Sequence, residues 1–475
     1  MKILTKIILF STILAFRNAA LFGGKVVVSG DFKNAIGEQV YVFAYADFLS
    51  LKETSLAKTI IDQNGHFELT FDINTLQPII VDIAFYRQFI YVEPFNTYHI
   101  QSEKFQVIQN GNPYIPESFI DAKVTSRSLS DSLFRQLEIH ISHFLDTAGV
   151  KIYSQHRSDL VENFRQNIWK NLPENLTENY KNAIAFRLAY LYPNAQLPDG
   201  YSSLNEIAID YNNYEYFRWL EDYLQKQLFK ENSLNLQSVI TRNLMLALNK
   251  SDSFHSLKDT LSEILSVRNE AANELYTLVA LKILYATPMF SNTKIIADLQ
   301  QIRDSSSIEI HKLIAQNLLN KFTGLKPGSL VPDVVVKIYK GDSIRMREYC
   351  QKPLYIVFAR KECRTCLSNL EMLRPLFPNF KDQVNFLAVF TSHDTLADAR
   401  IVEQMKYPWP SIIAGRNYEL LHAFEAYSLP LEMLVSPGCR IAAYPAYQVN
   451  DGLEAILRKM TFQSQQTQSL EKSHH

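Results

Sequence analysis

The sequence predicts a multidomain α+β protein with an N-terminal β-sheet domain, a central α-helical domain and a C-terminal α/β domain. Its 475 residues are about three times the usual length of one domain. Apolar residues alternate near the start, recur every three or four positions in the middle, and form short runs between helical stretches at the end. We expect the domain ranges to be 21–110, 111–325 and 326–462, with a signal peptide at 1–20 and a flexible tail at 463–475.

The composition is that of a folded protein. Hydrophobic residues make up 47% of the chain, including 25 Tyr and 29 Phe, and charged residues make up 20%, which provides for packed cores and argues against disorder. The 14 Gly and 18 Pro exclude a collagen-like or low-complexity chain. Because the formal net charge is -1, the chain as a whole is not attracted to nucleic acid, and we expect no nucleic-acid partner.

The N-terminal segment has the pattern of a secretory signal. Lys2 and Lys6 precede the apolar stretch 7–16, and the small residues Ala19 and Ala20 follow it. This stretch is too short to span a bilayer. We therefore expect a periplasmic or extracellular protein that is soluble once the signal peptide is removed. A buried first strand and an uncleaved anchor are the alternatives.

The next part of the chain, from Gly24 to about Val107, alternates between apolar and polar residues as a half-buried sheet does. Turn-forming residues at Asp62–Gly65 and Glu93–Pro94 separate the runs. The region therefore predicts an all-β domain. Its expected strands are Lys25–Gly30, Gln39–Ala44, His66–Phe71, Ile79–Ile83 and Phe89–Val92.

From about residue 128 to 324 the apolar period becomes that of helices. We expect a bundle or an irregular helical array. Aromatic residues crowd Tyr211–Trp219 and predict helix packing, with a peptide or glycan site as the alternative. His140 and His143 predict a surface or packing pair, with a metal site as the alternative. The apolar sets with helical spacing are Leu133-Leu137-Ile141-Phe144, Ile184-Leu188-Leu191 and Leu275-Leu278-Leu281-Leu284.

After the turn at Gly324–Gly328, strands and helices alternate. This order predicts a small α/β sheet with helices on both faces. The expected strands are Leu354–Ala359, Val384–Phe390, Ser411–Ile413, Leu431–Val435 and Arg440–Tyr444, and the expected helices are Cys366–Leu373, Leu396–Met405, Tyr418–Tyr427 and Gly452–Met460.

Two cysteines, Cys363 and Cys366, stand three residues apart where the Leu354–Ala359 strand gives way to a helix. Two thiols with this spacing can form a disulfide, and the helix N-terminus stabilises the first sulfur as a thiolate. We therefore expect Cys363 to be the nucleophile and Cys366 to resolve the mixed disulfide. Half a zinc site has the same spacing, but no further pair of ligands accompanies it, and we expect no metal and no cofactor.

Residues from about 327 to 460 resemble a thioredoxin-fold domain of the extracytoplasmic thiol-disulfide oxidoreductase type. The resemblance rests on the cysteine pair at the strand-to-helix junction, on the inserted helix and strand before Ile412, and on Ser428-Leu429-Pro430 entering a strand. It implies that Pro430 is cis and faces the cysteine pair, with an ordinary trans proline as the alternative. It also implies protein disulfide or thiol substrates and a redox partner protein.

The two regions before residue 326 resemble known families less closely than the C-terminal region does. The β-sheet domain is similar to the small sheet domains that often precede thioredoxin modules in secreted bacterial proteins, and the helical region resembles no named family. These two domains are expected to position partners or to form a homo-oligomer.

Two positions depart from the pattern of the family. Glu362 stands where an aromatic residue commonly precedes the first cysteine, and Val357 stands where many thioredoxins carry a buried acid. Such an acid would take the proton of the resolving thiol, so either turnover is slow or another acid substitutes.

The remaining cysteines, Cys350 and Cys439, are expected at the edge of the sheet opposite the active site. A disulfide between them and two isolated buried thiols are both open.

Two functions follow from the sequence. The first is a periplasmic or secreted thiol-disulfide oxidoreductase that acts on proteins through Cys363 and Cys366. The second is a non-catalytic binding or assembly protein that uses a thioredoxin fold as a scaffold and keeps the cysteine pair as a structural disulfide.

Overall fold

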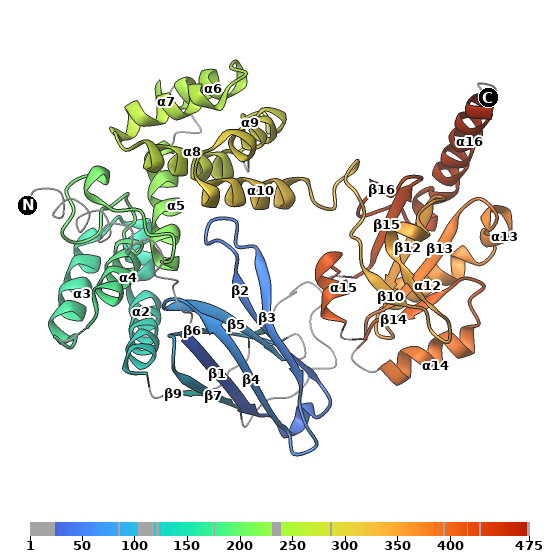
Figure 1. Ribbon diagram of the computed structural model, residues 1–475, viewed down its shortest axis with the longest axis horizontal. Coiled ribbons are helices and arrows are strands. Elements are labelled where there is room, and N and C mark those ends of the chain that lie inside the picture. Colours follow the sequence, from blue (N-terminus) through green and yellow to red (C-terminus); the bar gives the residue numbers. More distant parts are fainter. Residues whose placement is uncertain are drawn as a thin grey trace, which may run out of the picture. The chain divides into compact units, whose positions relative to one another are not determined.

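The computed structural model describes residues 24–83, 86–102, 118–119, 123–126, 128–174, 176–229, 239–285, 287–392, 395–415, 417–426 and 429–472 (Figure 1). The predicted signal peptide lies outside these residues. The described residues divide into two compact units. The first holds those within 24–82, 88–102 and 123–318, and the second holds residue 83, residues 86–87 and 118–119, and those within 319–472. The domain ranges expected from the sequence stay predictions.

The N-terminal strands form two sheets. Strand order is β4-β1-β7-β9 in the first sheet and β3-β2-β5-β6-β8 in the second. Side chains of β4 are alternately buried and exposed, as the sequence predicts for a strand with one buried face. The strands are β1 (Gly24–Asp31), β2 (Gln39–Tyr45), β3 (Glu53–Ile60), β4 (His66–Ile73), β5 (Gln77–Ile83), β6 (Tyr86–Val92), β7 (Thr97–Gln101), β8 (Ser118–Phe119) and β9 (Lys123–Ser126).

The five strands predicted from this region are all present, and β3, β7, β8 and β9 were not predicted. β3 lies at the edge of its sheet and buries none of its residues fully. β3 therefore lacks the strong apolar alternation by which strands are detected.

The helical region of the first unit consists of nine helices within the described residues. Its aromatic cluster packs inside the protein, because Tyr216, Phe217 and Trp219 on α5 are almost fully buried. His140 and His143 lie on the exposed side of α2. The helices are α2 (Leu129–Ser154), α3 (Ser158–Asn171), α4 (Glu178–Ala189), α5 (Tyr214–Leu228), α6 (Val239–Asn249), α7 (Phe254–Leu265), α8 (Glu270–Tyr285), α9 (Asn292–Ser305) and α10 (Glu309–Thr323).

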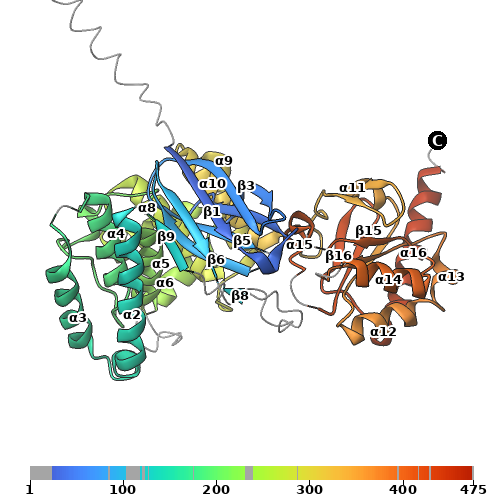
Figure 2. The ribbon, with the colours of Figure 1, turned by 90° about the horizontal axis from the view of Figure 1, so that it is seen from below.

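The C-terminal unit is built on a five-stranded sheet with the order β14-β13-β12-β15-β16 (Figure 1). Figure 2 shows the same unit from below, with β15 and β16 of this sheet labelled. β12, β13 and β14 are parallel, whereas β15 runs antiparallel to β12 and β16. The elements are β10 (Val335–Lys337), β11 (Ser343–Arg345), α11 (Met346–Tyr349), β12 (Leu354–Ala359), α12 (Arg364–Leu373), α13 (Phe377–Phe380), β13 (Asn385–Phe390), α14 (Thr395–Met405), β14 (Ser411–Ile413), α15 (Tyr418–Ala423), β15 (Leu431–Ser436), β16 (Arg440–Ala443) and α16 (Leu453–Lys472).

β12 is the centre of this unit. All six of its residues are buried, which is expected of a strand whose two faces are both covered. This is why Leu354–Ala359 reads in the sequence as a continuous apolar run. Apart from the end of the last helix, the strands and helices predicted for the region are confirmed to within a few residues. The β10–β11 hairpin, α11 and α13 were not predicted, because they are too short to show a period.

The last helix is longer than expected. α16 continues to Lys472, into the segment 463–475 that the sequence analysis treats as a flexible tail. The segment Thr461–Lys472 contains no glycine or proline, and its glutamines, leucine and lysine favour helix. Within the described ranges, no helix combines the length and apolar character that crossing a membrane requires.

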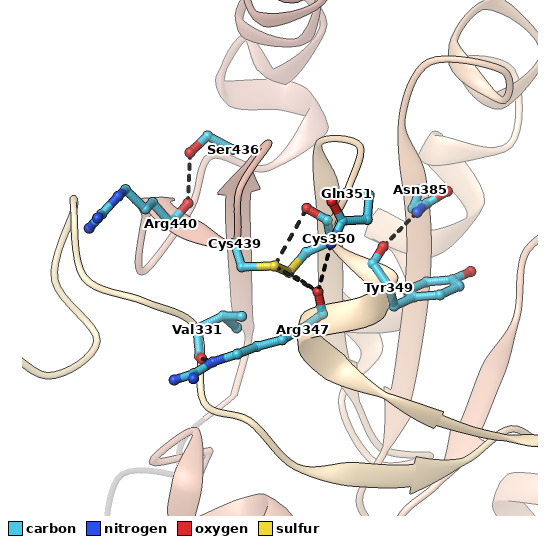
Figure 3. The surroundings of a disulfide bond; sticks show 9 residues. All are labelled: Val331, Arg347, Tyr349, Cys350, Gln351, Asn385, Ser436, Cys439 and Arg440. Carbon is cyan, nitrogen blue, oxygen red and sulfur yellow. Dashed lines mark hydrogen bonds between the residues drawn. A yellow bond between two sulfur atoms is a disulfide. The ribbon is translucent and has the colours of Figure 1, made fainter.

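A disulfide joins Cys350, which ends α11, to Cys439 in the turn between β15 and β16. Their Cα atoms are 5.1 Å apart, and the bond closes a sequence separation of 89 residues. Both sulfurs lie near the carbonyl oxygen of Arg347, at 3.5 and 2.9 Å (Figure 3). The sequence leaves open whether Cys350 and Cys439 form a disulfide or are two isolated buried thiols, and the structure has the disulfide.

Candidate functional site

The Cys363–Cys366 pair sits at the start of α12. Cys363 is the N-cap residue of the helix, and the backbone N–H of Cys366 points at its sulfur, with an N–Sγ distance of 3.2 Å. The two cysteines form a disulfide with Cα atoms 5.3 Å apart. Cys366 is fully buried, whereas Cys363 is partly exposed. The two sulfurs therefore differ in access, an arrangement that suits a nucleophile and a resolving thiol.

The segment between β12 and α12 carries several charges. Lys361 and Glu362 form an ion pair with an N–O distance of 3.7 Å, so the Glu362 carboxylate neutralises part of the positive charge beside Cys363. Burial lowers the pKa of Arg360, against the opposing effect of the carboxylates of Glu362 and Asp398. The helix N-terminus adds positive potential at the Cys363 sulfur.

A buried carboxyl group holds this segment in place. Asp398 on α14 accepts hydrogen bonds from the backbone N–H (2.8 Å) and the hydroxyl (2.6 Å) of Ser392. The Ser392 hydroxyl oxygen in turn accepts the backbone N–H of Lys361 at 3.1 Å. Burial raises the pKa of Asp398 to about 6. The sequence analysis missed Asp398, because an acidic residue on an expected helix gives no sign that it is buried.

A second buried carboxyl group lies under α12. Glu432 on β15 is only 2% exposed, and it pairs across the sheet with Val357 on β12. Cross-strand partners point to the same face of a sheet, so Glu432 extends from the face on which the missing acid at Val357 would stand. The sequence analysis missed this residue too, because its position depends on strand register.

Neutral side chains hold the Glu432 carboxyl group. The Asn369 amide on α12 donates to one carboxyl oxygen at 2.9 Å, and the Gln448 amide approaches the other at 3.4 Å. Asn369 is itself fixed, since its oxygen accepts the backbone N–H of Val449 at 3.2 Å. Burial is the main cause that raises the pKa of Glu432 to about 7, with a smaller contribution from the charge of Asp451.

Pro430 lies at the same end of the sheet as the cysteine pair. The register pairs Leu431 with Phe358, so Pro430 comes just beyond the carboxyl end of β12, from which the chain leads to Cys363. The Leu429–Pro430 peptide bond is cis and Pro430 is exposed. Ser428, the first residue of the predicted motif, lies outside the described residues. The substrate-binding role of Pro430 stays a prediction.

No group of three or more histidine, cysteine, aspartate or glutamate side chains suited to a metal occurs among the residues that the structure describes. The pair of histidines on α2 is therefore not accompanied by further described ligands.

Comparisons with known proteins cover about a quarter to a third of the chain. No protein-family model matches. The chain is 28% identical over 123 residues to the thiol-disulfide oxidoreductase ResA of Geobacillus kaustophilus, a match that covers 26% of this chain and 70% of that protein. It is 23% identical over 148 residues to ResA of Bacillus cereus, covering 31% of this chain and 85% of the relative.

Solved structures align with the same fraction of the chain. The thioredoxin domain of a thiol-disulfide oxidoreductase from Bacteroides vulgatus is 20% identical, with a TM-score of 0.26, and the alignment covers 28% of this chain and 97% of that one. StoA from Bacillus subtilis is 14% identical with a TM-score of 0.22, over 24% of this chain and 87% of that one.

The ResA matches agree with what the C-terminal unit contains: a five-stranded sheet in which β15 is antiparallel, a cysteine pair at the start of α12 and a cis proline before β15. The C-terminal part of this chain is a thioredoxin-like domain of the thiol-disulfide oxidoreductase type.

Proposed function

We propose that this protein is a periplasmic or secreted thiol-disulfide oxidoreductase that exchanges disulfides with protein substrates through Cys363 and Cys366. The observation that carries the proposal is the position of Cys363 at the N-cap of α12, where the Cys366 N–H points at its sulfur. A thiolate formed at that place is stabilised by the helix dipole and by this hydrogen bond.

The exchange proceeds in two steps. In the reducing direction the Cys363 thiolate attacks a substrate disulfide, forms a mixed disulfide and releases one substrate thiolate. The Cys366 thiolate then attacks the Cys363 sulfur, closes the Cys363–Cys366 disulfide and releases the second substrate thiolate. Two electrons pass to the substrate, and running both steps backwards oxidises a substrate dithiol.

Several features support an oxidising compartment. The N-terminal segment has the pattern of a secretory signal. All four cysteines are paired, which agrees with a location where disulfides persist. In this proposal a separate redox protein restores the active pair, and the domains at 21–110 and 111–325 bind partners or form a homo-oligomer, while 326–462 carries the chemistry.

Trapping of the mixed disulfide tests this function. Cys366→Ser leaves Cys363 without a resolving thiol, so the reduced variant should accumulate a covalent adduct with a protein disulfide such as that of insulin. Cys363→Ser is the matched control and should form no adduct, because the remaining Cys366 sulfur is buried. The adduct is measured by mass spectrometry without reductant. Equal adduct formation by both variants, or none by Cys366→Ser, contradicts the proposal and favours the non-catalytic scaffold.

A further inference from the structure

The buried acid missing at Val357 has a counterpart on the neighbouring strand. Glu432 is as deeply buried as a strand residue of the core, and no cation forms an ion pair with it among the residues that the structure describes. Its two partners, Asn369 and Gln448, are neutral amides. A buried carboxylate without a cation is costly, and burial therefore raises the pKa of Glu432 to about 7. Its acid and base forms are both populated near neutral pH.

Asn369 places this carboxyl group relative to the cysteine pair. Cys366 and Asn369 are three residues apart on α12, and both are fully buried. Residues with this spacing lie on one face of a helix with about 5–6 Å between their Cβ atoms. The carboxyl oxygen that accepts from Asn369 at 2.9 Å therefore lies on the side of α12 that carries the resolving sulfur. A bridging water can carry a proton between two such groups.

We infer that Glu432 is the proton acceptor for the Cys366 thiol in the resolving step, in place of the acid absent at Val357. This inference rests on the proposed function. The Cys366 proton passes to the Glu432 carboxylate, the thiolate attacks the Cys363 sulfur of the mixed disulfide, the Cys363–Cys366 bond forms and the substrate thiolate leaves. In the opposite direction protonated Glu432 returns the proton to the departing Cys366 thiolate.

The groups around Glu432 are compatible with its accepting a proton. Asn369 and Gln448 donate hydrogen bonds that stabilise the carboxylate, and Asp451 opposes its ionisation. Tyr355 on β12 donates its hydroxyl to the Tyr447 carbonyl, at 2.9 Å. Asp398, the other buried carboxyl group described above, is bound to Ser392 through both oxygens and anchors the segment before Cys363.

Stopped-flow reaction with the disulfide DTNB separates the two steps. The protein is used with only the Cys363–Cys366 pair reduced. Attack by Cys363 releases the first thionitrobenzoate, and resolution by Cys366 releases the second. Glu432→Gln should leave the first phase unchanged and slow the second at least tenfold at pH 7, within the range that general bases contribute. The deficit should shrink above about pH 9, where a thiol ionises without help.

Glu371→Gln is the matched control. Glu371 lies on α12, the helix that carries Cys366, but it pairs with Arg374 at the surface. It should follow wild-type protein at every pH. If Glu432 acted only as a negative charge, its removal would lower the thiol pKa and speed the second phase. A second phase that is equal or faster in Glu432→Gln therefore overturns the inference.

The wild-type pH profile is an independent measurement that does not depend on folding of the variant. The second phase should rise with pH and level off above about 7, whereas a continued rise to the ordinary thiol pKa, about 8.5, contradicts the role of Glu432. Reduction of insulin by wild-type protein tests the proposed function separately. An active wild type with a normal Glu432→Gln variant rejects only this inference.

Discussion

The two disulfides of the C-terminal unit lie at different places in one sheet and differ in their surroundings. At the carboxyl end of β12, the partly exposed Cys363 caps a helix and receives an N–H. The Cys350–Cys439 pair is buried, and its sulfurs face the Arg347 carbonyl oxygen instead of a donor. A thiolate is stabilised at the N-terminus of α12 and destabilised next to the Arg347 carbonyl oxygen. In the proposed function, these surroundings, more than the bond itself, are what would make the first pair reactive and the second structural.

The largest expected effect is the loss of exchange in Cys363→Ser. Replacing the sulfur removes the nucleophile, and turnover of insulin disulfides should fall by a factor of about 1,000 or more, to the background of the assay. The melting temperature, measured on the oxidised wild type and the variant, should change far less than in the variant described next. Residual turnover within tenfold of wild type would place the nucleophile elsewhere and erase the contrast between the two pairs.

The second effect is a loss of stability when the other pair is removed. Cys350→Ser combined with Cys439→Ser opens a loop of 89 residues, and the free energy of unfolding of the C-terminal unit should fall by about 2–5 kcal/mol. Denaturant titration measures this change. The variant should still reduce insulin at close to the wild-type rate where it is folded. A loss of activity without a loss of stability would mean that this pair takes part in electron transfer.

The third effect concerns the pH dependence of stability. Since burial raises the pKa of Glu432 to about 7, the folded state holds this proton between about pH 4.5 and 7 while the unfolded state has released it. The contribution of Glu432 to stability is thus fully present at low pH and is lost as pH rises through this window. Glu432→Gln should reduce this decrease in the free energy of unfolding by an amount on the order of 2 kcal/mol. Parallel stability curves for the two proteins would refute the raised pKa.

The smallest effect is expected at Glu362. Its carboxylate beside the active segment opposes a thiolate and pairs with Lys361. Glu362→Gln should lower the pKa of the Cys363 thiol by a few tenths of a unit, as the removal of a partly exposed neighbouring charge does. The pH dependence of Cys363 alkylation measures it. An unchanged pKa would show that Glu362 does not influence the sulfur, and an increase would contradict the expected direction.

The fold could be predicted from local patterns, and much of the site could not. β12 and the cysteine pair are visible in the sequence because a fully buried strand reads as an apolar run and because the spacing of Cys363 and Cys366 is a local property. Glu432 and Val357 are far apart in the sequence and meet only through the β12–β15 register. Asp398 is identified by its burial and its bonds to Ser392. Cys350 and Cys439 lie together at the edge of the sheet where the sequence predicts them. The sequence does not show whether the two sulfurs are bonded.

The most direct test of the account is a redox titration that follows both cysteine pairs in one sample of the mature protein. Free thiols are alkylated across a series of thiol buffers and assigned by peptide mass. The account predicts a midpoint between about -270 and -120 mV for Cys363–Cys366, and below about -300 mV for Cys350–Cys439. Equal midpoints, or a Cys363–Cys366 pair that stays oxidised below about -300 mV, would contradict it and indicate a structural disulfide in a binding protein.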